Sequence, residues 1–185
     1  SVRDVMPDRD VNDLGHGTAL AGLMLANQGF DGIAPGARLV SIRAFDTGPD
    51  GAAVSGSYEV AAAIDLAVAE GVQVLNLSFA GPRDPLVLSV LDEAAAAGMI
   101  FTAAAGNGGP NAAPAYPGAH RDAIAVTATD IKDRLFTGAN RGGYIAVAAP
   151  GVDVFAPLPD AKFEMLSGTS IATAPITAIV ALLPE

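Results

Sequence analysis

Apolar segments typical of buried strands alternate along the chain with segments of helical periodicity. The strand-like segments are Arg38–Phe45, Val72–Phe79, Met99–Ala105, Ala123–Thr129 and Tyr144–Ala148. Helical patterns lie between them, at Thr18–Asn27, Tyr58–Glu70 and Pro85–Ala97, and a last one begins near Thr169. Strands that are apolar throughout and are joined by helices predict a parallel sheet that is covered on both faces. We therefore expect residues 1–185 to form a single three-layer α/β/α domain with a mainly parallel central sheet.

Composition and charge exclude several classes of function. With 10 Lys and Arg against 20 Asp and Glu, the net charge is −10, which disfavours a nucleic-acid partner because phosphate would be repelled. The absence of cysteine excludes disulfides, thiolate zinc sites and a cysteine nucleophile. The most apolar segment, Ile171–Leu183, has 13 residues, fewer than the roughly 20 of a membrane-spanning helix. We therefore expect neither a nucleic acid nor a membrane as partner.

Two histidines are candidates for chemistry. His16 lies in Gly15-His16-Gly17-Thr18, at the start of an apolar helical pattern. Glycines on both sides would leave the imidazole accessible, so His16 is either a general base or a capping or surface histidine. His120 lies in a polar loop beside Arg121 and is expected to be solvated.

A serine and an asparagine each allow a structural and a catalytic interpretation. Ser170 ends the sequence Ser167-Gly168-Thr169-Ser170 directly before an apolar helix. A serine there can simply cap the helix, but the N–H groups at a helix N-terminus also suit a developing oxyanion. Asn107 follows a buried strand within Gly106-Asn107-Gly108, where it could serve as a turn residue or as an amide donor to an oxyanion.

In their order along the chain, the segments that contain His16, Asn107 and Ser170 resemble the subtilisin-like serine proteases, or subtilases. The resemblance extends from residue 13 to about residue 183, which is nearly the whole chain. The matching blocks are Gly15-His16-Gly17-Thr18 with Ala21-Gly22, Gly32-Ile33-Ala34-Pro35, Asn76-Leu77-Ser78, Ala103-Ala104-Ala105-Gly106-Asn107, Tyr116-Pro117, Ala149-Pro150-Gly151, and Gly168-Thr169-Ser170 with Ala172.

The resemblance implies roles for these residues. It makes Ser170 the nucleophile of a peptidase, His16 its general base, and Asn107 an oxyanion donor together with the Ser170 N–H. It also implies two walls for the substrate chain, one formed by Ser78, Phe79, Ala80 and Gly81 and the other by Ala104, Ala105 and Gly106. Ala80 departs from the family pattern, which has glycine there, and its methyl group is expected to narrow the groove.

The catalytic aspartate of the family has no convincing counterpart in the chain. In the family it ends a strand upstream of the histidine, but Asp4, Asp8, Asp10 and Asp13 follow no hydrophobic strand. Asp46-Thr47-Gly48 repeats the family's triplet but comes after His16, so we interpret it as a variable loop. Two hypotheses result. Either the protein is a serine peptidase whose aspartate lies outside these 185 residues, or it is a non-catalytic member of the fold that binds peptides or has a structural role.

The resemblance carries further expectations. The family's aspartate strand lies inside the parallel sheet, so the domain is expected to be incomplete at its N-terminus, and also at its C-terminus. Unpaired strand edges should result, at which the chain would associate with itself or bind an N-terminal segment. The expected substrate is a polypeptide. The family often binds calcium, although no calcium site can be assigned here and no other cofactor is indicated, and its members are commonly secreted or periplasmic.

Overall fold

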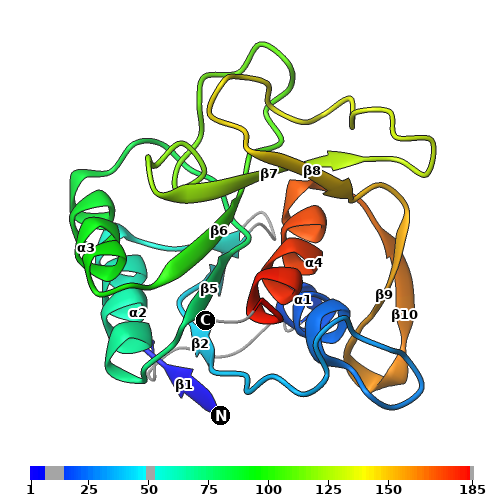
Figure 1. Ribbon diagram of the computed structural model, residues 1–185, viewed down its shortest axis with the longest axis horizontal. Helices are drawn as coiled ribbons and strands as arrows, with labels where there is room; N and C mark the ends of the chain where they lie inside the picture. The colour runs from blue at the N-terminus through cyan, green and yellow to red at the C-terminus, as the bar shows by residue number, and fades with distance from the viewer. Residues whose placement is uncertain (7–14, 49–52, 184–185) are drawn as a thin grey trace.

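A four-stranded parallel sheet forms the centre of the computed structural model, which describes residues 1–6, 15–48 and 53–183 (Figure 1). In spatial order the strands are β5 (Val74–Leu77), β6 (Ile100–Ala104), β7 (Ala123–Thr129) and β8 (Val147–Pro150). Each strand pairs in parallel with the next. The residues of β6 and β7 are almost entirely buried, as expected for strands covered on both faces.

Helices cover the sheet on both sides, which confirms the three-layer α/β/α prediction (Figure 1). On one face, α2 (Ser57–Ala69) and α3 (Pro85–Ala96) pack against β5 and β6. On the other face α4 (Thr169–Ala181) packs against the sheet, and α1 (Gly15–Leu25) packs against α4. Among the described residues, no helix has the length and apolar character needed to cross a membrane.

Three smaller strand pairs surround this sheet. β1 (Val2–Asp4) runs parallel to β2 (Ser41–Arg43), and β3 (Asp46–Thr47) is antiparallel to β4 (Ala53–Val54). β9 (Val154–Pro157) and β10 (Phe163–Leu166) form an antiparallel hairpin around the short 3-10 helix Pro159–Ala161. Asp46 and Thr47, which we interpreted as part of a variable loop, instead form β3, a strand of a short antiparallel pair that follows α1 in sequence.

The boundaries of two predicted strands differ most from the observed ones. The predicted strand Arg38–Phe45 shortens to the three residues of β2. The predicted strand Tyr144–Ala148 begins at Val147 instead, because the Ile145 N–H bonds the Gly142 carbonyl in a turn and the Tyr144 hydroxyl is tied to the Ala105 carbonyl. Turn hydrogen bonds therefore replaced ladder pairing in a segment of high strand propensity.

Buried hydroxyl groups connect α4 to the sheet. The Thr177 hydroxyl lies 2.8 Å from Asn76 Oδ1 and 2.6 Å from the hydroxyl of Thr102, which is completely buried. It also lies 2.9 Å from the Thr173 carbonyl. The cluster therefore joins α4 to two neighbouring strands, β5 and β6.

Replacing Thr177 with valine is expected to lower the free energy of unfolding by about 1–3 kcal/mol. The new side chain fills nearly the same space but leaves Asn76 and Thr102 with one partner fewer. Urea denaturation monitored by circular dichroism measures the change. The matched control is T137V at an exposed position, expected to stay within about 0.5 kcal/mol of the unmodified chain. Equal effects of the two substitutions would contradict a stabilising role for the cluster.

Candidate active site

Ser170 lies in the first turn of α4 and is half-buried. The residue before the helix, Gly168, has φ 153° and ψ 163°, a conformation that is essentially restricted to glycine. Its N–H bonds the Gly151 carbonyl at 2.7 Å, which fixes the chain as it enters the helix. The serine is therefore held at a helix N-terminus, where free N–H groups and the helix dipole favour negative charge.

Asn107 and Ser170 converge on Gly168. A Cβ atom placed on Gly168 would lie 3.3 Å from Asn107 Nδ2 and 3.4 Å from Ser170 Oγ. The amide donor and the hydroxyl thus face the same side of one glycine, although 62 residues separate Asn107 from the helix start at Thr169. This arrangement brings a candidate nucleophile and a candidate oxyanion donor to a common point, as the motifs predict.

Thr169 determines which end of the Asn107 amide faces this point. Asn107 Oδ1 accepts hydrogen bonds from the Thr169 N–H and the Thr169 hydroxyl, each at 3.0 Å. Because the oxygen is engaged by Thr169, the NH₂ group is left to face Gly168 and Ser170. Thr169 itself is completely buried, and its Oγ1 also accepts from the Gly106 N–H at 3.2 Å.

Two further residues hold the loop that carries Asn107. The Asn140 side chain accepts from the Gly108 N–H at 2.8 Å and donates to the Ala113 carbonyl at 3.2 Å. The Asn140 N–H bonds the Gly106 carbonyl, and Gly106 has φ +103°. Asn107 thus follows the end of β6 in a loop that is fixed on both sides.

His16 lies in the first turn of α1 and is exposed. Behind it, Leu20 and Leu23 of α1 pack in one buried cluster with Ile171 and Ala174 of α4, which ties the helix of His16 to the helix of Ser170. His16 also lines the same large cavity as Ser78, whose hydroxyl donates to the Ser170 carbonyl at 2.9 Å. The predicted base thus lies on a helix packed directly against the helix of the predicted nucleophile.

The first predicted substrate wall follows the end of β5. The Ser78 hydroxyl is committed to Ser170, and Phe79 packs on Phe45 with their ring centroids 5.0 Å apart, so both side chains point inward. Ala80 is exposed, and Gly81 forms a two-bond bridge with Tyr116. A substrate chain could therefore meet this segment through its backbone and at Ala80.

The second predicted wall is the end of β6 and the turn that follows it. Ala104, Ala105 and Gly106 are buried, and the backbone groups of Ala105 and Gly106 are already hydrogen-bonded within the fold. The Tyr144 hydroxyl donates to the Ala105 carbonyl at 2.7 Å and holds this strand end in place.

One of the four aspartates that precede His16 lies within the described residues. Asp4 bonds Arg43 at 2.7 Å and accepts from the Met6 N–H at 2.7 Å. The Arg43 side chain lowers the pKa of Asp4 and the Met6 N–H contributes, so Asp4 acts as an ion-pair partner of β2. Asp8, Asp10 and Asp13 lie outside the described residues.

The prediction that His120 is solvated is wrong. Its side chain is 5% exposed and meets the Phe101 ring edge-on, with a centroid separation of 5.4 Å. Its Nε2 lies 3.3 Å from Asp92, and its Nδ1 accepts from the Asp122 N–H at 3.2 Å. Packing against a core phenylalanine therefore outweighed the polar local sequence.

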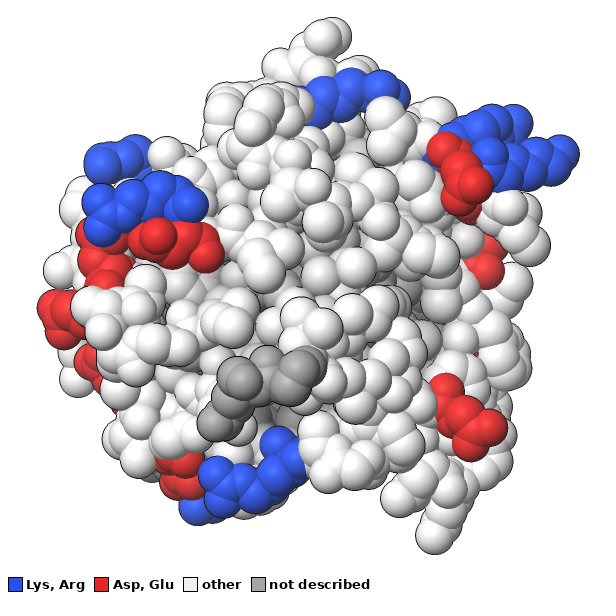
Figure 2. Space-filling model, in the orientation of Figure 1, with Lys and Arg blue, Asp and Glu red and all other residues white. Residues whose placement is uncertain are grey.

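Charged side chains lie mostly around the rim of the face shown in Figure 2.

Comparison with known proteins places this chain in a family. The sequence profile described as the subtilase family matches residues 3–185. The chain belongs to the subtilase family. It is 35% identical over 177 residues to thermitase of Thermoactinomyces vulgaris, covering 93% of this chain and 62% of thermitase. It is 32% identical to subtilisin DY of Bacillus licheniformis, covering 91% of this chain and 63% of that protein.

Solved structures agree with the family assignment. A mutant of the protease domain of PatA superposes on this subtilase with a TM-score of 0.88 and 25% identity, covering 98% of this chain and 70% of that chain. A cold adapted subtilisin-like serine proteinase gives a TM-score of 0.81 and 26% identity, covering 91% and 60%. The subtilase chain spans less than two thirds of the length of thermitase and of subtilisin DY.

Sequence reasoning missed the residues that orient the site of this subtilase. Thr169 occurs in a matching block but received no role, and Asn140 was not singled out. Both act through hydrogen bonds to residues far away in sequence, 62 positions for Thr169 and 32 for Asn140. For Thr169 the available signal was its place as a polar residue inside a motif. Asn140 is a lone asparagine in a glycine-rich loop, and the sequence offered no signal for it.

Proposed function

We propose that the protein is a serine endopeptidase that cleaves polypeptides through an acyl-enzyme on Ser170. The observation that carries this proposal is the convergence of Asn107 Nδ2 and Ser170 Oγ on Gly168 at the start of α4. A helix cap alone does not require an oriented amide donor beside the serine. Acyl transfer requires both a nucleophile and donors for the oxyanion.

The proposed reaction has two stages. Ser170 Oγ attacks the carbonyl carbon of the scissile peptide while His16 accepts the hydroxyl proton, and the oxyanion receives hydrogen bonds from Asn107 Nδ2 and the Ser170 N–H. His16 then gives the proton to the leaving amine as the C–N bond breaks. Water, activated by the same imidazole, next attacks the ester, and Ser170 recovers its proton when the acid product leaves.

The surroundings of Ser170 support a polypeptide substrate. The segments after β5 and β6 flank the site, and their side chains are small or turned inward. An extended substrate could thus pair with the backbone of the segment after β5 as an added strand and gain affinity with little dependence on its own side chains. The backbone groups of Ala105 and Gly106, after β6, are already bonded within the fold. Orienting the imidazole needs a carboxylate, whose loss typically reduces the rate by about 10,000-fold.

Covalent labelling of the purified chain tests this proposal. A biotinylated fluorophosphonate reacts with activated serines, and peptide mass mapping of the product identifies the modified residue. We expect one adduct, on Ser170, formed faster at pH 8 than at pH 5 because a neutral imidazole must accept the proton. Because the peptidase hypothesis places the catalytic aspartate outside these 185 residues, the labelling is repeated on the full-length parent protein. Absence of an adduct on both proteins would overturn the proposal and favour the non-catalytic, peptide-binding alternative.

A further inference from the structure

The hairpin formed by β9 and β10 lies at the edge of the molecule beside α1 (Figure 1). It carries three large apolar side chains that the described part of the chain leaves uncovered. Phe155 is 53% exposed, Phe163 is 42% exposed and Met165 is 57% exposed. Contiguous exposed apolar surface on a small domain commonly marks a site of interaction. We call these three side chains, together with the adjoining ring of Phe30, the hairpin patch.

The side chains of the hairpin patch form one continuous surface. The rings of Phe155 and Phe163 are stacked, with their centroids 4.9 Å apart and an interplanar angle of 8°. Phe30, in the loop after α1, has its ring centroid 6.2 Å from that of Phe163. Met165 lies directly opposite Phe155 in the antiparallel register, where side chains are close neighbours. Aromatic and methionine side chains are enriched in protein-binding surfaces, so the patch suits large apolar side chains of a partner.

The outer edge of β10 adds backbone hydrogen-bonding groups to this surface. The Leu158 N–H bonds the Lys162 carbonyl at 2.8 Å, so these two residues form a hydrogen-bonded pair of the hairpin. In antiparallel strands such pairs alternate with pairs that are not hydrogen-bonded. Phe163 and Met165, one and three positions further on, therefore direct their N–H and C=O groups away from β9. Among the strands that the structure describes, β10 pairs with β9 alone, so this edge is open.

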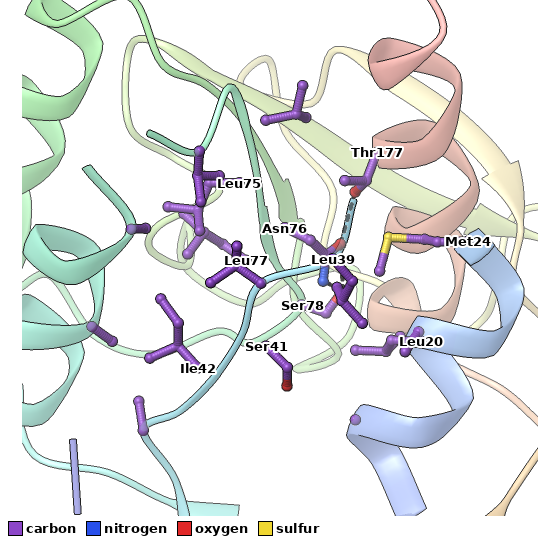
Figure 3. Close-up of a pocket in the computed structure, with 18 of the residues that line it drawn as sticks. Leu20, Met24, Leu39, Ser41, Ile42, Leu75, Asn76, Leu77, Ser78 and Thr177 are labelled. Carbon is purple, nitrogen blue, oxygen red and sulfur yellow. Dashed lines mark hydrogen bonds between the residues drawn. The ribbon is translucent and has the colours of Figure 1, made fainter. Parts of the chain in front are cut away.

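The hairpin packs against the helix that carries His16. Gly22 of α1 lies so close to Pro157 of β9 that a Cβ atom would overlap the proline ring. Leu20 and Met24, two positions to either side, lie on the opposite face of α1 and line the large pocket shown in Figure 3. The hairpin patch is therefore separated from that pocket by α1, and it lies on the side of the active site from which α1 extends.

β10 also leads directly into the active site. The strand ends at Leu166, and Ser170 follows four positions later in the first turn of α4. In the proposed reaction His16 protonates the leaving amine, so the substrate residues after the scissile bond begin beside His16. They lead away from Ser170, whereas β10 runs toward it. A substrate chain that follows the open edge is therefore antiparallel to β10.

The spacing along β10 determines which substrate residues could reach the patch. Met165 lies five positions before Ser170, and Phe163 lies seven positions before it. In extended chain these separations are at most about 17 Å and about 23 Å, which an antiparallel partner covers with roughly its fourth to seventh residues. The two residues that face Phe163 and Met165 are themselves two positions apart, and their side chains lie on the face of the patch.

We propose that the hairpin patch is an exosite that binds the polypeptide substrate on the leaving-group side of the scissile bond. The substrate pairs with the open edge of β10 and places two large apolar side chains, two positions apart, on Phe155, Phe163 and Met165. This inference rests on the proposed function and adds to it a preference at about the fifth and seventh residues after the scissile bond. The continuity of β10 with Ser170 favours the substrate over a second copy of this chain as the occupant.

Peptide binding tests the exosite without requiring catalysis. The probe is a ten-residue peptide of Ser and Gly with a free amino end, Phe at positions five and seven, and fluorescein at the carboxyl end. One control peptide has Ser at these two positions, and another keeps both Phe residues but carries N-methyl groups on them. Anisotropy with the full chain should show saturable binding of the probe. Each control should bind at least about 10-fold more weakly, because one loses apolar burial and the other loses two N–H donors.

Substitutions in the hairpin patch locate the binding. The double variant F155S/M165T removes apolar surface from exposed positions and should weaken probe binding at least about 10-fold, with an unchanged circular dichroism spectrum. The matched control is I131S, because Ile131 is 97% exposed in a loop outside the patch, and it should bind the probe as the unmodified chain does. Absent binding, equal affinity of the three proteins, or a dimer that F155S/M165T dissociates would each overturn the proposal.

Photo-crosslinking determines the orientation of the bound peptide. A benzoylphenylalanine at position seven of the probe should crosslink within residues 154–166, and one at position one should crosslink within residues 15–18. Peptide mass mapping identifies the modified segments. The reverse order would place the peptide parallel to β10 and would contradict binding on the leaving-group side.

Hydrolysis separates the exosite from the proposed function. Two substrates share the residues before the scissile bond, and one ends two residues after it while the other continues through the probe sequence. In the protein that also carries the catalytic carboxylate, F155S/M165T should lower kcat/KM at least about 10-fold for the long substrate and leave the short one unchanged. Equal responses of the two substrates would refute the exosite and retain the peptidase. Patch-dependent probe binding without hydrolysis of either substrate would refute the peptidase and retain the hairpin patch as a peptide-binding surface.

Discussion

Replacing Ser170 with alanine is expected to abolish fluorophosphonate labelling and to reduce peptide hydrolysis on the order of a million-fold, the scale expected when a nucleophile that acts together with its base is removed. The change deletes one oxygen atom from a half-buried position, so the fold should persist. The Asn107–Thr169 contacts do not involve the serine hydroxyl and should remain. Labelling and hydrolysis of a chromogenic peptide measure the two effects, in the protein that also carries the catalytic carboxylate.

The matched control lies three residues earlier. Ser167 is exposed, and its hydroxyl contacts Asp153 rather than the active site. S167A should therefore label and hydrolyse at the rate of the unmodified chain. Retained labelling in S170A, or its loss in S167A, would show that Ser170 is not the nucleophile.

The positions of the central strands could be predicted because their sequences are apolar on both faces. β5, β6 and β7 lie within the predicted segments, since burial in a parallel sheet leaves a continuous apolar signal. The hairpin of β9 and β10 gave no such signal. Phe155 is 53% exposed and Met165 is 57% exposed, so apolar side chains occur there without burial.

The site residues that occur in sequence motifs could be predicted. The environment of a residue that depends on tertiary packing could not. Ser170 and Asn107 occur in short glycine-containing segments that restrict their interpretation. His120 was assigned to solvent because its neighbours in sequence are polar, whereas the residue that buries it, Phe101, lies on β6. Its environment depends on a tertiary contact between residues 19 positions apart, for which neither segment has a pattern.

Replacing Asn107 with leucine is expected to lower kcat by about 100–1,000-fold with little change in KM. Leucine has nearly the same shape but no donor, and the oxyanion that Asn107 would stabilise exists in the transition state and not in the bound substrate. N111L, at an exposed asparagine of the same loop, is the matched control and should leave both constants unchanged. Steady-state hydrolysis of a chromogenic peptide by the protein that also carries the catalytic carboxylate gives kcat and KM.

Thr169 allows the donor role of Asn107 to be separated from its contribution to the fold. Asn107 Oδ1 is held by both the N–H and the hydroxyl of Thr169. T169V removes one of these two bonds, together with the bond that Thr169 Oγ1 accepts from the Gly106 N–H, and leaves the Nδ2 donor in place. We expect a loss in kcat of about 5-fold, because one neutral hydrogen bond contributes about 1 kcal/mol. A decrease in N107L no larger than in T169V would show that Asn107 positions the loop rather than stabilising the oxyanion. An increase in KM with constant kcat would instead place Asn107 in ground-state substrate binding.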